Sequence, residues 1–205
     1  MKKGLLITIE GIEGCGKSTL SNNLFKKLQE SNSKLFLTKE PGQTIIGEKI
    51  KKILYEEKHQ MAAKTEFLLF AANRAQHFHE IIVPKLNDNY IIISDRMGDS
   101  SIAYQGFGLG LDIETLQDIN KWAMNDISPD LTIYVRLDIE TAFKRLSSRG
   151  SLTSFEQQNN TFWQKTVKGF ETIFKDKKNV LILDGTKSPE QLVMESVDKI
   201  QSLIK

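Results

Sequence analysis

The chain has 205 residues, of which 40% are hydrophobic and 26% charged, and its formal net charge is +2. This predicts one globular domain with a substantial core, without the clustered basic face that is typical of nucleic-acid binding. No apolar run approaches the ~20 residues that cross a bilayer, and the single Cys15 excludes an internal disulfide and fits a reducing compartment. We therefore expect a cytoplasmic enzyme without nucleic-acid or membrane partners.

The predicted strands are short, mostly continuous apolar runs, which are typical of parallel strands covered on both faces. They are Leu5–Ile9, Leu35–Thr38, Tyr90–Ser94, Leu131–Leu137 and Val180–Leu183. The first follows two lysines and superficially resembles a signal peptide, but its apolar run is short and Glu10 interrupts it. We expect a buried strand there.

Longer amphipathic stretches separate the strands. The predicted helices are Lys17–Ser31, Ile45–Glu56, Ala62–Leu86, Ile113–Asn125, Ile139–Ser148, Gln157–Phe174 and Pro189–Ile204. Pro84 is expected to bend or end the third helix, and Ser188, Pro189 and Gln191 predict a capped start for the last one. Repeated strand–helix alternation predicts an α/β fold, a doubly wound three-layer α/β/α arrangement around a five-stranded parallel sheet. We expect a single domain over residues 1–205.

A glycine-rich loop directly follows the first predicted strand. It reads GIEGCGKS from Gly11 to Ser18, which fits G-x-x-x-x-G-K-[ST], and it precedes a predicted helix. Glycines let backbone N–H groups turn toward a phosphate, and the following helix points its positive end at the same anion. Lys17 is expected to reach the β- and γ-phosphates and Ser18 to help hold Mg²⁺. The alternative, a flexible turn with a surface lysine, leaves the flanking strand and helix unexplained, so we predict a P-loop NTPase-type fold with a bound nucleoside triphosphate.

Asp95 and Arg96 follow a second buried strand. Ligands of open α/β sheets bind beyond the carboxyl ends of the strands, so both side chains are expected to face the loop. Asp95 would orient a Mg²⁺-bound water, and Arg96 would offer a planar fork to a second phosphate group. A surface ion pair is an equally good interpretation of these two residues alone.

Phe70 and Arg74 lie four residues apart and hence on one face of a predicted helix. An aromatic plane beside a guanidinium would stack a flat base and bind its edge. Taken alone, a core phenylalanine with a surface arginine is the commoner arrangement.

A polar, glycine-containing stretch runs from Ser100 to Gly106. Its hydroxyl and amide groups would line a polar pocket, and its glycines suggest a mobile loop, although an ordinary polar connection is as good an interpretation. The histidines His59, His77 and His79 have no convincing metal-ligand spacing, so no zinc site is predicted.

Five segments in this order resemble bacterial thymidylate kinase over nearly the whole chain. They are IEGIEGCGKST, TKEPGQTIIGEKIKKIL, LLFAANRAQH, SDRMGDSSIAYQG and PDLTIYVRLDIETAFKRLSSRG. The resemblance implies transfer of the γ-phosphoryl group of ATP to thymidine monophosphate (dTMP), with Mg²⁺ as cofactor. It also implies a short lid at about residues 145–157 and a homodimer formed through the long helices.

The resemblance assigns site residues by position. Residues implied for ATP are Gly11, Ile12, Glu13, Gly14, Cys15, Gly16, Lys17, Ser18, Thr19 and Arg145. The segment 184–186 resembles the loop on the other side of the adenine. Residues implied for dTMP are Glu13, Phe70, Arg74, Arg96, Ser100, Ser101, Tyr104 and Gln105. Residues implied for catalysis are Lys17, Asp95, Arg96 and Arg149, with Ser18 and Asp95 at the metal.

Individual roles follow from the same resemblance. Phe70 would stack on thymine and Arg74 would bind its edge. Glu13 would meet the 3′-hydroxyl side of the sugar, which accounts for a carboxylate inside an anion-binding loop. Arg96 would grip the acceptor phosphate, and Tyr104 would crowd the 2′ position and so favour deoxyribose.

The chain departs from the family pattern at the extra catalytic arginine. Relatives carry this residue in the phosphate loop, where this chain has Gly14, or in a lid that commonly reads R-G-E-L-D-R-I-E. The lid here reads RGSLTSFE from Arg149, so Ser154 stands where an arginine is expected. We hypothesise that Arg149, alone or with Arg145 or Arg136, supplies the missing cation.

Smaller departures and two local hypotheses remain. Lys39 replaces an arginine, Gln43 replaces a glycine, and Arg136 stands where relatives usually show an acidic residue. The Glu40–Pro41 bond is expected to be cis, because this tight segment must return beside the acceptor site. Cys15 at a helix N-terminus is either a reactive thiol, whose alkylation blocks ATP binding, or a small inert residue in a crowded loop.

Two further functions remain open at this point. One is a kinase for another nucleotide or a deoxynucleoside. The other is a nucleotide-binding regulatory module that has lost phosphotransfer, an interpretation that Ser154 keeps open and the intact Lys17, Ser18, Asp95 and Arg96 oppose.

Overall fold

The computed structural model of the chain describes residues 4–56, 61–148 and 158–204. Its centre is one sheet of five parallel strands in the order β2-β3-β1-β4-β5. The strands are β1 Leu5–Glu10, β2 Leu35–Lys39, β3 Ile91–Asp95, β4 Leu131–Arg136 and β5 Val180–Asp184. The predicted α/β fold with a five-stranded parallel sheet is confirmed.

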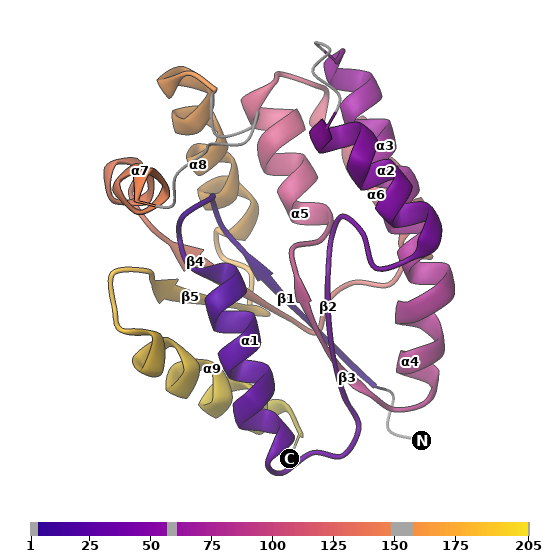
Figure 1. Cartoon of the computed structure of the whole chain (residues 1–205), viewed down its shortest axis with the longest axis vertical. Coiled ribbons are helices and arrows are strands. Elements are labelled where there is room, and N and C mark those ends of the chain that lie inside the picture. The colour runs from indigo at the N-terminus through magenta and orange to yellow at the C-terminus, as the bar shows by residue number, and fades with distance from the viewer. Residues whose placement is uncertain (1–3, 57–60, 149–157, 205) are drawn as a thin grey trace.

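Helices cover both faces of this sheet. The α-helices are α1 Lys17–Gln29, α2 Ile45–Glu56, α3 Ala63–His77, α4 Val83–Asn87, α5 Gly98–Ser101, α6 Ile113–Ala123, α7 Ile139–Ser147, α8 Asn160–Phe174 and α9 Pro189–Ile204. Two π-helical segments, η1 Phe78–Ile82 and η2 Ile102–Gly108, continue α3 and α5. Helices α1 and α9 lie side by side on one face of the sheet, and α4, α5 and α8 lie on the other (Figure 1).

Side chains of the central strands alternate between two buried layers. Ile7 and Ile9 of β1 join Leu20 and Leu24 of α1 in the largest core cluster. Leu6, which directly precedes Ile7, packs in a second cluster with residues of η1 and α4. Such burial on both faces is why the strands read as continuous apolar runs.

The strand order places the phosphate-loop segment beside the end of β3. Strand β1 lies between β3 and β4, and its register sets Ile9 beside Asp95 and Glu10 beside Tyr134. The loop that leaves β1 at Gly11 therefore emerges next to Asp95 and Arg96. Residues far apart in sequence meet at this edge of the sheet because parallel strands end together.

Pro84 does not end the third predicted helix. The helical run continues from α3 through η1 and α4 to Asn87. Before the proline, the Val83 N–H bonds to the carbonyl of Phe78 in π-helical geometry. Proline has no N–H to donate, and a locally wider turn accommodates it within a continuing helix.

The segment 98–108 is helical, and the expectation of a mobile loop was wrong. Its glycines permit close packing: a Cβ on Gly108 would come within 2.6 Å of the Phe162 ring, and one on Gly169 of α8 within 2.9 Å of Phe107. The glycines therefore let η2 approach α8 closely, and this tertiary packing overrides their poor helix propensity.

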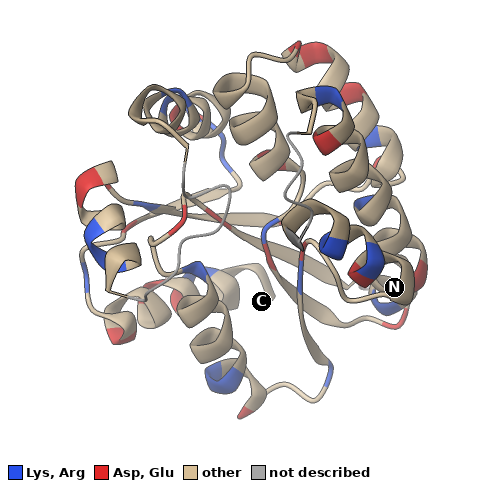
Figure 2. Cartoon of the chain, turned by 45° about the horizontal axis from the view of Figure 1, so that its top comes forward, with Lys and Arg blue, Asp and Glu red and all other residues tan. Residues whose placement is uncertain are grey.

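Charges and caps complete the outer layer. Ser188 and Gln191 form the predicted capping box, with the Ser188 N–H donating to Gln191 Oε1 at 3.1 Å and the Gln191 N–H to Ser188 Oγ at 3.3 Å. Figure 2 shows lysines and arginines interspersed with acidic residues along the helices. Within the described ranges, no helix is long and apolar enough to span a membrane.

Candidate active site

The glycine-rich loop turns between β1 and the start of α1 at Lys17. Gly14 has a φ of +77°, and a Cβ at this position would lie 2.5 Å from the carbonyl oxygen of Ala142 in α7. Neither the backbone conformation nor the space at residue 14 suits a side chain. The loop itself therefore has no room for a catalytic arginine at this position.

Lys17 folds over the loop that precedes it. Its Nζ donates to the carbonyl of Ile12 at 2.6 Å and lies 3.6 Å from Cys15 Sγ. Cys15 is 1% exposed and belongs to the main core cluster. This burial favours an inert packing role for the thiol over the reactive one.

Ser18 and Asp95 meet at the mouth of the loop. The Ser18 hydroxyl donates to Asp95 Oδ2 at 2.5 Å, which joins α1 to the end of β3. A hydroxyl and a carboxylate are the hard oxygen donors that Mg²⁺ prefers, and Mg²⁺ completes its shell with water and substrate phosphates. The pair fits such an ion, and the described residues contain no group of three or more His, Cys, Asp or Glu side chains that could form an all-protein cage.

Arg96 adopts a left-handed backbone conformation with a φ of +72°. Its Nη2 lies 2.6 Å from Glu13 Oε1, and its Nη1 donates to Ser100 Oγ at 3.0 Å and to the carbonyl of Gly11 at 3.3 Å. Non-glycine residues in this conformation cluster at functional sites, where surrounding contacts hold them in place. Burial opposes the charge, but Glu13 and the other acidic groups nearby together outweigh it and raise the pKa of Arg96 well above its usual range.

Tyr104 contacts the other oxygen of the same carboxylate. Its hydroxyl donates to Glu13 Oε2, and its ring packs edge-on against Trp163 and Phe170 of α8. Burial and the Glu13 charge raise the pKa of Tyr104, so the phenol stays protonated and donates. Glu13 is thus fixed between a guanidinium and a phenol at the boundary of the phosphate loop.

Two cavities adjoin at this boundary. The phosphate cavity is lined by Glu13, Gly14, Gly16, Lys17, Ser18, Thr19, Lys39, Glu40, Asp95 and Arg96. The second, which we call the acceptor cavity, is lined by Glu13, Glu40, Tyr55, Phe70, Arg74, Arg96, Met97, Ser100, Ser101, Tyr104 and Gln105. Glu13, Glu40 and Arg96 belong to both, so the cavities share one wall.

Phe70 and Arg74 lie in the wall of the acceptor cavity. Phe70 is half-buried, while Phe67, one turn earlier in the same helix, fills the core. Arg74 is only 1% exposed. The simple alternative of a core phenylalanine and a surface arginine is therefore wrong for this pair.

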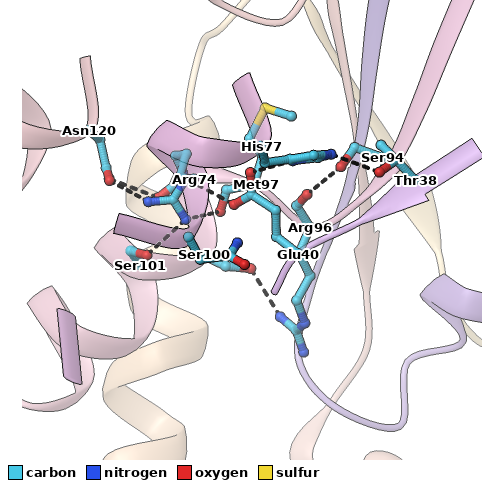
Figure 3. A network of polar contacts seen from close by, with 12 residues as sticks. Thr38, Glu40, Arg74, His77, Ser94, Arg96, Met97, Ser100, Ser101 and Asn120 are labelled. Carbon is cyan, nitrogen blue, oxygen red and sulfur yellow. Dashed lines mark hydrogen bonds and ion pairs between the residues drawn. The ribbon is translucent and has the colours of Figure 1, made fainter. Parts of the chain in front are cut away.

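A buried polar network holds Arg74 (Figure 3). Its Nε lies 3.0 Å from Glu40 Oε2 and its Nη1 donates to Asn120 Oδ1 at 2.5 Å. Its Nη2 donates to Ser101 Oγ at 3.1 Å and to the carbonyl of Met97 at 3.3 Å. Arg74 is thus fixed by four residues from three different segments of the chain.

Glu40 is the centre of this network. Its other oxygen lies 3.0 Å from His77 Nδ1, and His77 Nε2 lies 2.7 Å from Thr38 Oγ1. Burial opposes ionisation, but Arg74 and His77 together lower the pKa of Glu40. The carboxylate therefore stays charged inside the protein, and the predicted cis bond to Pro41 directly after it is confirmed.

Comparison with known proteins agrees with this geometry. The family model for thymidylate kinase matches residues 9–197 of the chain. The thymidylate kinase of Halothermothrix orenii is 38% identical over 98% of this chain and 99% of its own length. The thymidylate kinase of Finegoldia magna is 38% identical over 96% of this chain and 98% of its own length. The thymidylate kinase of Exiguobacterium sp. is 36% identical over 95% of this chain and 93% of its own length.

The chain belongs to the thymidylate kinase family. Most residues that the resemblance assigned to the phosphate loop and the acceptor lie together around the two cavities. Ile12 and Cys15 of the loop are buried and line neither cavity. Arg149 and Ser154 lie outside the described residues.

Arg136 and Arg145, two of the arginines considered as the extra catalytic cation, already have partners within the protein. Arg136 makes a two-pronged ion pair with Glu171 of α8, at 2.8 Å from Nε and 2.6 Å from Nη2. Arg145 Nη2 donates to the carbonyl of Gly185 at 3.0 Å, which brings α7 against the 184–186 loop. The contact of Arg145 suits the predicted adenine side of the site, whereas the guanidinium of Arg136 is engaged by Glu171.

Sequence reasoning missed several residues that shape the site. They are Glu10, Glu40, Tyr55, Glu66, His77 and Asn120. Glu10 is buried at the end of β1 and accepts hydrogen bonds from the Met97 N–H at 2.7 Å and from Ser100 Oγ at 2.5 Å. Burial, reinforced by the nearby Asp99 charge, raises the pKa of Glu10 to about 8. A glutamate that interrupts an apolar run was the one available signal for this residue.

Proposed function

We propose that this chain transfers the γ-phosphoryl group of ATP to dTMP, giving ADP and thymidine diphosphate. The observation that carries the proposal is the wall shared by the phosphate cavity and the acceptor cavity. Arg96 and Glu13 belong to both, so a triphosphate in the loop and a monophosphate beside Arg96 would meet at this wall. Membership of the thymidylate kinase family supports the same assignment.

The acceptor cavity suits a pyrimidine deoxynucleotide. Phe70 offers an aromatic face for the base, and Arg74 and Gln105 offer polar groups for its edge. Tyr104 and Glu13, joined by their hydrogen bond, would border the sugar. The acceptor phosphate would then lie by the guanidinium of Arg96, next to the phosphate loop.

Phosphoryl transfer requires mainly alignment and neutralisation of charge. An oxygen of the dTMP phosphate attacks the γ-phosphorus, and the bond from that phosphorus to the β–γ bridging oxygen breaks. Lys17 would exchange its contact with the Ile12 carbonyl for the β- and γ-phosphates, and Arg96 would neutralise charge on the acceptor side. Mg²⁺ held by Ser18 and Asp95 would neutralise the terminal phosphates of ATP when bound.

The missing lid arginine leaves one cation to assign. The proposal assigns this role to Arg149, within a lid of about residues 145–157 in a single kinase domain. Arg136 is engaged by Glu171 and Arg145 by the carbonyl of Gly185, which supports Arg149 over these two.

A coupled ADP-release assay with a panel of nucleoside monophosphates tests the function. We expect turnover with dTMP and much lower turnover with cytidine, adenosine and guanosine monophosphates in their deoxy forms. Turnover with another acceptor in preference to dTMP would contradict the substrate. ATP binding without turnover of any acceptor would contradict phosphotransfer.

A homodimer and a cytoplasmic location also form part of the proposal. Exposed apolar side chains lie on three helices that pack together, with Ile46 on α2 48% exposed, Leu68 on α3 54% and Trp122 on α6 79%. Such side chains would be covered in a dimer formed through the long helices. Sedimentation of the wild-type chain and of Leu68→Glu tests this, since a monomeric wild type would contradict it. The single cysteine supports the reducing compartment, and cell fractionation tests it.

A further inference from the structure

Glu66 is a half-buried carboxylate that the proposed mechanism does not use. It lies in the first turn of α3, and its Oε1 accepts a hydrogen bond from Gln105 Nε2 at 2.7 Å. Gln105 belongs to η2, is 2% exposed and lines the acceptor cavity together with Arg74. The contact therefore ties a residue of the cavity wall to a neighbouring helix.

This hydrogen bond fixes which end of the Gln105 amide is free. The two ends of a glutamine amide have nearly the same shape, but one donates and the other accepts. An ionised carboxylate only accepts, so Glu66 holds the nitrogen end. No described residue donates a hydrogen bond to Gln105 Oε1, so an acceptor oxygen is left on a side chain that lines the cavity.

Arg74 supplies the opposite polarity in the same cavity, because a guanidinium only donates. Four of its five N–H groups already donate to described residues, which leaves one N–H on Nη1. A base edge at this wall would therefore meet this donor of Arg74 and an acceptor from Gln105. Thymine offers the O4 acceptor beside the N3–H donor, whereas cytosine offers the N4 amino donor beside the N3 acceptor. The Arg74 donor and the Gln105 acceptor therefore match thymine. Cytosine would set a donor against the donor of Arg74 and an acceptor against the acceptor of Gln105.

We propose that Glu66 is a positioning residue for base selection: it holds the Gln105 amide in the orientation that accepts from thymine and disfavours cytosine. The inference rests on the proposed function for the identity of the acceptor. A competing explanation is that Glu66 only stabilises α3 through its position in the first helical turn. The two explanations differ in whether Glu66 needs Gln105 to exert its effect.

Calorimetric measurement of the affinities for dTMP and deoxycytidine monophosphate (dCMP) separates these two explanations of the role of Glu66. Glu66→Gln keeps the shape but can donate or accept, so it no longer fixes the amide of Gln105. We expect the ratio of dTMP to dCMP affinity to fall about tenfold, the size of one hydrogen bond. Gln105→Met should lower the ratio at least as much, and adding Glu66→Gln to Gln105→Met should lower it no further. A matched control is Glu114→Gln, which removes an exposed first-turn charge from α6.

Four results would overturn the inference. The first three are a wild type that binds both nucleotides equally, a Glu66→Gln affinity ratio equal to that of wild type, and a loss from Glu66→Gln that is just as large when Gln105 is already methionine. Full selectivity in Gln105→Met would overturn it even if Glu66→Gln failed to fold. Because binding needs no turnover, a wild type that prefers dTMP but does not phosphorylate it would contradict the proposed function and not the role of Glu66.

Discussion

Ser18 Oγ lies 2.5 Å from Asp95 Oδ2, although the two residues are 77 positions apart in the chain. Ser18 opens the helix after the phosphate loop, and Asp95 ends the strand that pairs with β1. Neither residue alone distinguishes a metal site from a surface contact. Their meeting at the carboxyl edge of the sheet is what supports a site for nucleotide-bound Mg²⁺.

Asp95→Asn should weaken the response of the enzyme to Mg²⁺. The amide keeps the size of the side chain and can still accept a hydrogen bond from Ser18, but it loses the negative charge that attracts a divalent cation. We expect roughly 10–100-fold lower activity or a correspondingly higher Mg²⁺ requirement. Steady-state rates measured across Mg²⁺ concentrations check this. An unchanged Mg²⁺ dependence would remove Asp95 from the metal site.

Arg149→Ala should lower kcat while the affinity for dTMP changes little. An arginine that neutralises the moving phosphoryl group is typically worth about 10³–10⁵ in rate. Arg136→Ala, measured beside it, should lower kcat far less, because its guanidinium is already paired with Glu171. If the two variants exchanged these effects, Arg136 would be the cation donor.

Glu40→Ala should destabilise the fold strongly. The substitution leaves Arg74 and His77 buried without their shared carboxylate, and an uncompensated buried charge costs about 3–5 kcal/mol. The free energy of unfolding in urea measures this. Glu140→Ala is a matched control that breaks only an exposed pair with Lys144, so its effect should be much smaller. Equal losses in both variants would show that the network contributes little to stability.

The sequence was sufficient for features that depend on local pattern. Continuous apolar runs predicted the strands, and the glycine spacing predicted the phosphate loop. The capping residues Ser188 and Gln191 predicted the start of the last helix. Each of these signals lies within a few consecutive residues. The physics that forms them is equally local, so they can be read before any tertiary contact is known.

The buried network around Arg74 could not be read in this way. Glu40 lies 34 positions from Arg74 and 37 from His77 in the chain. Residues this far apart do not share a helix or strand here, so their spacing does not predict a contact. The segment 98–108 was misjudged for a related reason. Its glycines match a loop by propensity, and only the approach of α8 makes their lack of side chains a packing requirement.

Glu10→Gln should flatten the dependence of stability on pH. With a pKa of 4.5 for an unperturbed glutamate and about 8 in the fold, the folded state keeps a proton between these values that the unfolded state has lost. This contribution to stability is full below pH 4.5 and is lost as pH rises through 8, at up to about 1.4 kcal/mol per pH unit. Unfolding free energies of both proteins from pH 5 to 8 check this. Parallel curves for the two proteins would contradict it, and Glu30→Gln, an exposed substitution, should run parallel to wild type.

Gln43→Gly should stabilise the protein. Gln43 has a φ of +71°, a left-handed conformation that costs an ordinary residue roughly 1–2 kcal/mol and glycine almost nothing. Glycine also makes the unfolded chain more flexible, which lowers the free energy of unfolding by about 0.5–1 kcal/mol. The net increase in the free energy of unfolding should therefore be about 0.5–1 kcal/mol. The backbone N–H of residue 43 keeps its bond to Glu48 Oε1, now 3.1 Å long, in either case. Gln43→Ala removes the same side chain without relieving the backbone, so urea unfolding of the two variants isolates the effect of φ. If alanine stabilised as much as glycine, the gain would come from losing the side chain and not from the left-handed backbone.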